Sequence, residues 1–203
     1  MADGRNCLAE GATDRVRIQE VQILSQDHYV LRKYRFEYRG RDGTWRPVVR
    51  QVYDRGNGAV ILLYDRQRRT VVLVRQFRLP ALVNGHPDGF LLEAPAGLLD
   101  EREPAEAIRR EAMEETGFKV VRVEPLFAPY MSPGSVSERL HFFMAEIDAT
   151  MRDGDGGGLA EENEDIEVVE LPFNEALAMI GRGEIADAKT IMLLYHARIA
   201  GLL

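Results

Sequence analysis

The apolar residues of this chain fall in short runs separated by turn-forming residues. The longest unbroken runs cover residues 59–64 and 70–74, far short of the ~20 residues that a membrane-spanning helix needs. Short runs rich in β-branched side chains are typical of strands in a sheet. We therefore expect a sheet-containing protein without a transmembrane segment, and 203 residues suit a domain with a sizeable core.

The pattern before residue 100 favours strands, and the pattern after it mixes strands and helices. Strands are expected at residues 17–25, 29–38, 45–53, 59–64, 70–77, 89–94, 120–130, 138–146 and 166–171. Helices are expected at residues 104–116, 174–181 and 187–203. The strands 59–64 and 70–77 are close enough in sequence to form a hairpin.

Charge and cysteine content limit which classes of binding partner and which cellular compartment are expected for this protein. Acidic side chains outnumber basic ones by 33 to 26, and the net charge is -7. Nucleic-acid binding usually needs a basic surface, so we expect no nucleic-acid partner, and a cation fits the acidic balance better. The single cysteine, Cys7, cannot form an internal disulfide, and the N-terminus has no basic start followed by an apolar stretch. A cytoplasmic location is the expectation.

Three glutamates share one side of the expected helix at residues 104–116. Glu111, Glu114 and Glu115 stand at i, i+3 and i+4, and like charges at this spacing cost ~0.2–0.5 kcal/mol per pair. On a solvated acidic helix, water screens this repulsion. In a metal site, a divalent cation bound between the carboxylates would offset it. The three residues alone leave both interpretations open.

The residues around these glutamates form a longer motif. A glycine, Gly97, is followed by Glu103 and then by Arg-Glu-x-x-Glu-Glu-x-Gly over residues 110–117. This stretch resembles the signature box of the Nudix hydrolases, with six residues instead of the usual seven between Glu103 and Arg110. The shortening precedes the helical half of the box, so the carboxylates keep their register.

The resemblance implies a fold and a domain organisation. The expected fold is the Nudix α/β/α sandwich of the α+β class, a mixed sheet between helices, with an N-terminal antiparallel β-rich segment for dimerisation. Residues 1–15 would be a disordered tail, residues 16–55 the β-rich segment that also contacts the partner's substrate, and residues 56–203 the Nudix hydrolase domain.

Segments outside the box resemble the sugar-nucleotide branch of the family. They are residues 53–58, 75–78, 131–134 and 162–166. The resemblance implies a Mg²⁺-dependent pyrophosphohydrolase, with Mn²⁺ as a substitute metal, acting on a nucleotide sugar as a homodimer. Residues 83–85 and 187–190 favour GDP-mannose, which would give GMP and mannose 1-phosphate. Residues 158–164 favour ADP-ribose, which would give AMP and ribose 5-phosphate. A non-catalytic sugar-nucleotide sensor is the alternative of another class, but binding alone would not require so many carboxylates.

The resemblance also implies the metal site. Its ligands would be the backbone carbonyl of Ala96 and the side chains of Glu111, Glu115 and Glu164, with Glu114 as a further or water-mediated ligand. Arg110 would orient the carboxylates. Glu162 or Glu164 would be the general base or a late-arriving ligand. Both follow the glycines of residues 156–158, so we expect a mobile loop over residues 153–163 that closes on the substrate.

Substrate contacts are implied for residues in several parts of the chain. Arg78 would contact the pyrophosphate, because a planar guanidinium can bind two oxygens. Glu138 and Lys189 would lie near the sugar phosphates, with surface salt bridges as the alternative, and Glu138 is the next candidate for the general base. The expected nucleotide contacts, often from the partner subunit, are Tyr29, Arg50 and Gln51, the last at a position where a glutamate is usual.

Overall fold

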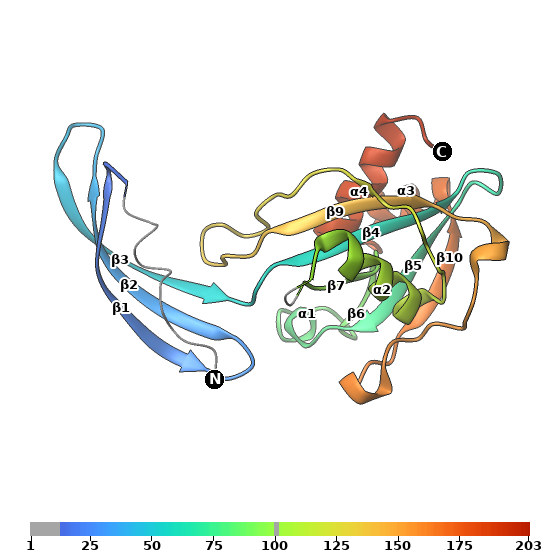
Figure 1. The fold of residues 1–203 in the computed structure, drawn as a ribbon, viewed down its shortest axis with the longest axis horizontal. Helices are drawn as coiled ribbons and strands as arrows, with labels where there is room; N and C mark the ends of the chain where they lie inside the picture. Colours follow the sequence, from blue (N-terminus) through green and yellow to red (C-terminus); the bar gives the residue numbers. More distant parts are fainter. Residues whose placement is uncertain (1–12, 100–101) are drawn as a thin grey trace. The chain divides into compact units, whose positions relative to one another are not determined.

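The computed structural model describes residues 13–99 and 102–203, without the side chain of Glu162. Residues 1–12 of the expected N-terminal tail, Cys7 among them, lie outside the described residues. The chain forms two compact units (Figure 1). The N-terminal unit contains the chain up to Gly56 and Tyr130–Arg139, and the C-terminal unit contains Asn57–Pro129 and Leu140–Leu203.

The N-terminal unit is built on an antiparallel sheet with the strand order β1–β2–β3. Its strands are β1 (Val16–Gln26), β2 (Val30–Arg39) and β3 (Trp45–Asp54). The register of β1 shifts after Ile18 and again after Ile23, and such bulges increase the local twist of a strand. This antiparallel arrangement confirms the expected β-rich start of the chain.

The segment Tyr130–Arg139 belongs to the N-terminal unit because it attaches to β3. The backbone N–H of Tyr53 donates to the carbonyl of Ser135 (2.8 Å), and the N–H of Ser137 donates to the carbonyl of Tyr53 (3.1 Å). The hydroxyl of Ser137 also donates to the carboxylate of Asp54 (3.3 Å). Three hydrogen bonds to two strand residues therefore fix this segment on the sheet.

The C-terminal unit contains a mixed sheet. Over the described residues its strand order is β10–β5–β4–β9–β8, with β6 paired to β5 and β7 paired to β4. The strands are β4 (Gly58–Asp65), β5 (Thr70–Phe77), β6 (Phe90–Glu93), β7 (Ala96–Leu98), β8 (Glu124–Pro125), β9 (Leu140–Glu146) and β10 (Glu167–Pro172). Strands β4 and β9 are parallel, and the other recorded pairs are antiparallel, including the expected β4–β5 hairpin.

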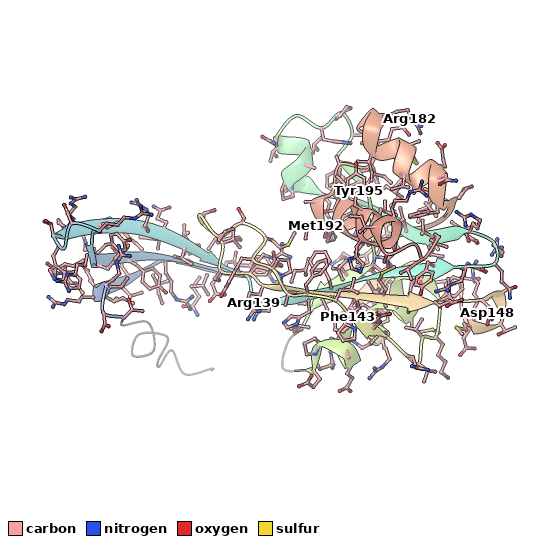
Figure 2. The ribbon with its side chains drawn as sticks, turned by 90° about the horizontal axis from the view of Figure 1, so that it is seen from above. Arg139, Phe143, Asp148, Arg182, Met192 and Tyr195 are labelled. Atoms are coloured by element: carbon pink, nitrogen blue, oxygen red, sulfur yellow. The ribbon has the colours of Figure 1, made fainter. Side chains whose placement is uncertain are left out.

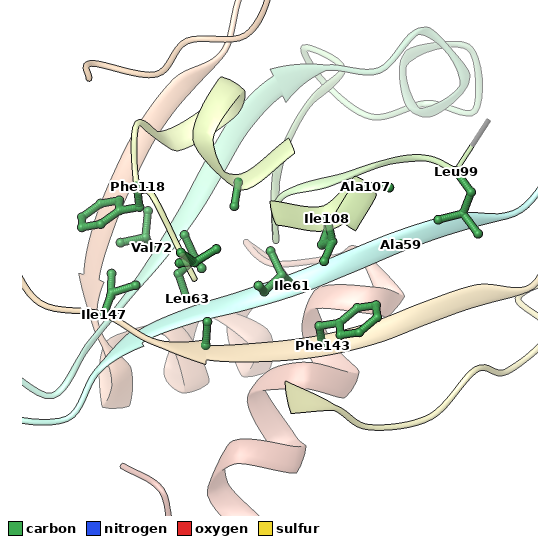
Figure 3. Close-up of a cluster of buried hydrophobic side chains, with 13 residues drawn as sticks. Ala59, Ile61, Leu63, Val72, Leu99, Ala107, Ile108, Phe118, Phe143 and Ile147 are labelled. Carbon is green, nitrogen blue, oxygen red and sulfur yellow. The ribbon is translucent and has the colours of Figure 1, made fainter. Parts of the chain in front are cut away.

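Helices cover both faces of this sheet. They are α1 (Leu79–Val83), α2 (Pro104–Thr116), α3 (Phe173–Arg182) and α4 (Ala188–Ile199), with 3₁₀ turns at Ala149–Met151 and Ala160–Glu162. Helix α2 lies on one face, and α3 and α4 lie on the other (Figures 1 and 3). All of β4 is buried as a result, which confirms the α/β/α sandwich. Met192 and Tyr195 of α4 remain partly exposed (Figure 2).

A hydrophobic cluster joins α2 to the sheet. Ile61 and Leu63 of β4 belong to it together with Ile108 of α2 and Phe143 of β9 (Figure 3). Burying a side chain of this size is worth ~1.5–3 kcal/mol relative to leaving it in water. The cluster thereby fixes the helix that carries the three glutamates.

Several elements differ from the sequence prediction, among them β7, which was not expected as a strand. The continuous strand expected over residues 120–130 is wrong, since regular pairing is confined to Glu124–Pro125, as β8, and Tyr130 forms only an isolated bridge. Pro125 and Pro129 lack the N–H that a ladder needs, and Val121 is 78% exposed. Helix α1 was not expected, because five residues are too few to show a helical period. The last helix ends at Ile199 rather than at residue 203.

No helix among the described residues is long and apolar enough to cross a membrane.

Candidate active site

Helix α2 presents one glutamate to the protein interior and two to a partly open surface. The helix ends where Gly117 adopts φ 74° and donates its N–H to Met113, a left-handed cap that favours glycine. Glu115 is only 2% exposed, whereas Glu111 and Glu114 are partly buried. Burial of Glu115 excludes an ordinary solvated acidic helix.

Glu115 is held in an environment that disfavours its charge. Its Oε2 accepts a hydrogen bond from the backbone N–H of Ala96 (3.2 Å). Burial raises the pKa of Glu115 well above its ordinary value, and the charges of Glu111 and Glu164 raise it further. A buried carboxylate surrounded by like charges needs a cation or a proton.

Glu111 lies directly against the backbone of β7. A Cβ atom on Gly97 would be 2.3 Å from Cδ of Glu111, so a larger residue at this position would displace the carboxylate. Arg110 donates through Nη2 to Glu111 (2.9 Å) and also approaches Glu114 (3.7 Å). Burial raises the pKa of Glu111, and the charges of Glu114 and Glu164 oppose the lowering effect of Arg110.

The glycine-rich loop attaches to the end of α2 through its backbone. The N–H of Gly157 donates to the carbonyl of Glu115 and the N–H of Gly158 to that of Glu114, both at 3.0 Å. A Cβ atom on Gly156 would lie 2.5 Å from the carbonyl oxygen of Glu115. The glycines that the sequence analysis linked to mobility thus permit a close approach of two backbones.

Glu164 follows this attachment. Its Oε2 accepts a hydrogen bond from the N–H of Leu159 (2.9 Å), and a Cβ atom on Gly158 would lie 2.6 Å from the same oxygen. The side chain of Glu162 lies outside the described part of the chain. Glu164 affects the pKa of both Glu111 and Glu115, so its carboxylate lies near these two side chains.

The donor set fits a hard divalent cation. Within residues 13–99 and 102–203, no three His, Cys, Asp or Glu side chains stand close enough to hold an ion as they are. The carboxylates of the three expected ligands accept hydrogen bonds from other groups. These pairs are Glu115 with Ala96, Glu111 with Arg110, and Glu164 with Leu159. These carboxylates are all oxygen donors with excess negative charge, which is the chemistry that Mg²⁺ prefers.

Arg78 and Lys189 meet at a second buried carboxylate that the sequence analysis missed. Glu93 of β6 is 2% exposed, and it accepts from Arg78 through Nε (2.8 Å) and Nη2 (3.1 Å) and from Lys189. Asp187 pairs with the Lys189 ammonium at 2.9 Å. The only sequence signal was one charged residue at the end of an apolar run, Phe90-Leu91-Leu92-Glu93.

The four other expected substrate residues lie in the N-terminal unit. Arg50 and Gln51 line a groove of about 800 Å³ between the sheet and the segment Tyr130–Arg139. Tyr29 packs edge-on against Tyr53 (5.7 Å between ring centroids), and the Arg55 guanidinium lies 5.6 Å from the Tyr29 ring.

Glu138 belongs to the same group of side chains. It is 9% exposed and pairs with Arg55 at 3.5 Å. The structure thus brings Tyr29 and Glu138 together through Arg55, and neither of the two lines the groove.

Two family models match consecutive parts of the chain. Residues 15–53 match the model described as GDP-mannose pyrophosphatase NudK N-terminal domain, and residues 54–194 match the NUDIX domain.

Curated relatives extend the likeness over nearly the whole chain. The GDP-mannose pyrophosphatase of Pectobacterium atrosepticum is 56% identical over 186 residues, covering 92% of this chain and 95% of that protein. The GDP-mannose pyrophosphatase of Yersinia enterocolitica is 55% identical over 190 residues, covering 93% and 98%. The solved structure of an ADP compounds hydrolase has a TM-score of 0.71 at 18% identity, covering 95% of this chain and 99% of that one. The last likeness concerns the fold alone.

Proposed function

This chain belongs to the Nudix hydrolases, and on that premise we propose that it hydrolyses GDP-mannose to GMP and mannose 1-phosphate. The substrate is supported by the N-terminal family match and by relatives above 50% identity that are named GDP-mannose pyrophosphatases. The observation that carries the chemistry is Glu115, a buried carboxylate next to the charges of Glu111 and Glu164. Such a site gains from binding a cation at the point where a diphosphate must also bind.

Nudix hydrolases generally use divalent metal ions such as Mg²⁺. In this chain the proposed cofactor is Mg²⁺, with Mn²⁺ as a substitute, held by the Ala96 carbonyl and by Glu111, Glu115 and Glu164, with Glu114 as a further ligand. When bound, the ion would stabilise charge on the phosphoryl oxygens and lower the pKa of its water. Arg110 orients Glu111 and Glu114 for this purpose, which its contacts at 2.9 and 3.7 Å support.

The reaction itself is a displacement by water at phosphorus. A water oxygen forms a new bond to one phosphorus while the bond to the bridging oxygen breaks, and attack at either phosphorus gives the same products. Glu162 or Glu164 takes the proton of the water, with Glu138 as the alternative base. Arg78 and Lys189 bind the phosphate oxygens.

Residues of the N-terminal unit would contribute to the proposed substrate site of the partner. Tyr29, Arg50 and Gln51 would contact the nucleotide, and Glu138 would contact the sugar phosphate region. We propose that residues 16–55 act as the dimerisation segment of a homodimer and reach the partner's site, while residues 56–203 form the hydrolase domain. The edge strand β1, which has no second partner strand among the described residues, supports an association of this kind. A cytoplasmic location fits the absence of cysteine pairs in the sequence.

ADP-ribose is the second candidate substrate. The segment Gly158–Glu164 favours it by resemblance. A sugar-nucleotide sensor is disfavoured, because the glutamates of α2 and the loop would repel an anionic ligand in a protein that only binds it.

Rates measured on a panel of nucleotide sugars with Mg²⁺ test the substrate proposal. We expect kcat/KM for GDP-mannose to exceed that for ADP-ribose at least ~10-fold, the discrimination that one or two well-placed contacts supply. A higher kcat/KM for ADP-ribose would make ADP-ribose the proposed substrate and leave the assignment of hydrolase activity unchanged. Binding without turnover of either compound would favour the sensor.

A further inference from the structure

The carboxylate of Glu93 holds two cations next to each other. Arg78 donates to Oε1 through Nε (2.8 Å) and to Oε2 through Nη2 (3.1 Å), and the ammonium of Lys189 also pairs with Oε2. One carboxylate oxygen therefore contacts both cations. Arg78 directly follows β5, Lys189 lies in the first turn of α4, and the acidic residue that joins them comes from β6.

Glu93 is ionised in this position in spite of its burial. Burial raises the pKa of Glu93, but the charge of Lys189 and the hydrogen bonds and charge of Arg78 outweigh it, and the pKa lies below its ordinary value. The contacts between Glu93 and both cations therefore persist at neutral pH.

Both cations keep donors for a ligand. Arg78 is 40% exposed in its side chain, and its Nη1 has no hydrogen-bond partner among the described residues. Lys189 gives two of its three ammonium hydrogens to Glu93 and Asp187. A diphosphate presents oxygens on two adjacent phosphorus atoms, so two neighbouring cations in fixed positions match its geometry.

We propose that Glu93 is a positioning residue that holds Arg78 and Lys189 together as one two-cation grip for the pyrophosphate of the substrate. The inference rests on the proposed function, which assigns the two cations to the phosphates. Without Glu93 the like charges repel, and two side chains with many rotamers separate.

The sign of the Glu93 effect distinguishes positioning from simple electrostatics. Glu93 is an anion beside an anion-binding site, so its charge alone weakens the attraction for phosphate. Removing that charge would strengthen binding if net charge were decisive, and would weaken binding if the arrangement of the cations were decisive. The two accounts predict opposite results for one substitution.

Calorimetric binding of methylenediphosphonate, a diphosphate that cannot be hydrolysed, tests the proposal in saturating Mg²⁺. We expect the Glu93→Gln variant to bind methylenediphosphonate at least ~10-fold more weakly than wild type. This is the size of effect expected from the loss of one charge-assisted hydrogen bond. Glu93→Asp keeps the charge but is too short to reach both cations, so the same direction is expected, and this variant carries the test if Glu93→Gln does not fold. The matched control is Glu170→Gln, which removes a carboxylate paired with Arg68 (2.7 Å) on β10 and should bind like wild type. Equal or tighter binding in both Glu93 variants would overturn the proposal.

A double-mutant cycle shows whether Glu93 acts through Lys189. In a Lys189→Met background, Glu93→Gln should weaken methylenediphosphonate binding less than it does in wild type, because only the contacts with Arg78 remain to be lost. Full additivity would mean that Glu93 acts in another way and would also overturn the proposal. The probe has no nucleoside and no sugar, so it reports on Glu93 even if GDP-mannose is not the substrate. Turnover of GDP-mannose by wild type then tests the proposed function separately.

Discussion

A Cβ atom on Gly97 would lie 2.3 Å from Cδ of Glu111 and 2.6 Å from its Oε1. The glutamate therefore occupies the space in which every other residue type would place its side chain. Gly97 lies on β7 and Glu111 on α2, so this contact sets how closely a glutamate of the candidate metal site approaches the sheet. Gly97 thus has a packing role that cannot be inferred from its position in the sequence motif.

Substitution of Gly97 by Ala should displace Glu111 and weaken metal binding. We expect the Mg²⁺ concentration for half-maximal rate to rise at least ~10-fold, as for loss of a group that fixes a metal ligand. Gly181→Ala is the matched control, since Gly181 lies in α3 with open space around its Cα and should keep the wild-type requirement. An unchanged Mg²⁺ requirement in Gly97→Ala would show that Glu111 is not a metal ligand or can move without loss.

Glu111→Gln and Glu115→Gln should each lower kcat at least ~100-fold, because each would remove a ligand that stabilises charge in the transition state. Stability measured in EDTA should not fall, since both substitutions remove like-charge repulsion and keep the shape of the side chain. Glu106→Gln is the control on the exposed first turn of the same helix. Near wild-type turnover in both variants would end the assignment of the metal site.

Glu162 and Glu164 should matter far more for turnover than for binding of the nucleotide sugar. The general base should lose one limb of the pH–rate profile when replaced by Gln, while a metal ligand should show a raised Mg²⁺ requirement. Glu161→Gln, an exposed neighbour in the same 3₁₀ turn, is the control. If both variants keep wild-type kcat and Mg²⁺ dependence, the loop is not catalytic, and Glu138 becomes the candidate base.

Glu93 should make stability depend on pH in the acidic range. Its folded pKa lies below the ordinary 4.5, so its contribution is present above pH 4.5 and is lost as pH falls through the folded value. The stability difference between wild type and Glu93→Gln should therefore be largest near pH ~7 and shrink below 4.5. Urea unfolding in EDTA at several pH values measures it. A difference that stays constant down to the acid transition would contradict the ion pairing described for Glu93.

The helix that carries the site could be predicted from local signals. Pro104 at its start and Gly117 after its end delimit α2, and the spacing of the three glutamates places them on one side. Residues 120–130 show the opposite case, because their apolar pattern suggested a strand although prolines prevent a continuous ladder.

Long-range contacts could not be predicted in the same way. Glu93 and Lys189 are 96 positions apart, and no periodicity in either segment indicates that they meet. The resemblance named Arg78 and Lys189 as substrate residues, but only the structure shows the carboxylate between them. The close approach of Gly97 to Glu111 is likewise a property of the packed sheet and helix.

Product analysis tests the central claim most directly. Wild-type protein is incubated with GDP-mannose and Mg²⁺, and the nucleotides and sugar phosphates are separated by anion exchange. Hydrolysis of the pyrophosphate bond predicts GMP and mannose 1-phosphate in equal amounts, with no formation in EDTA. Release of GDP and free mannose, or intact GDP-mannose after prolonged incubation with Mg²⁺, would contradict the account.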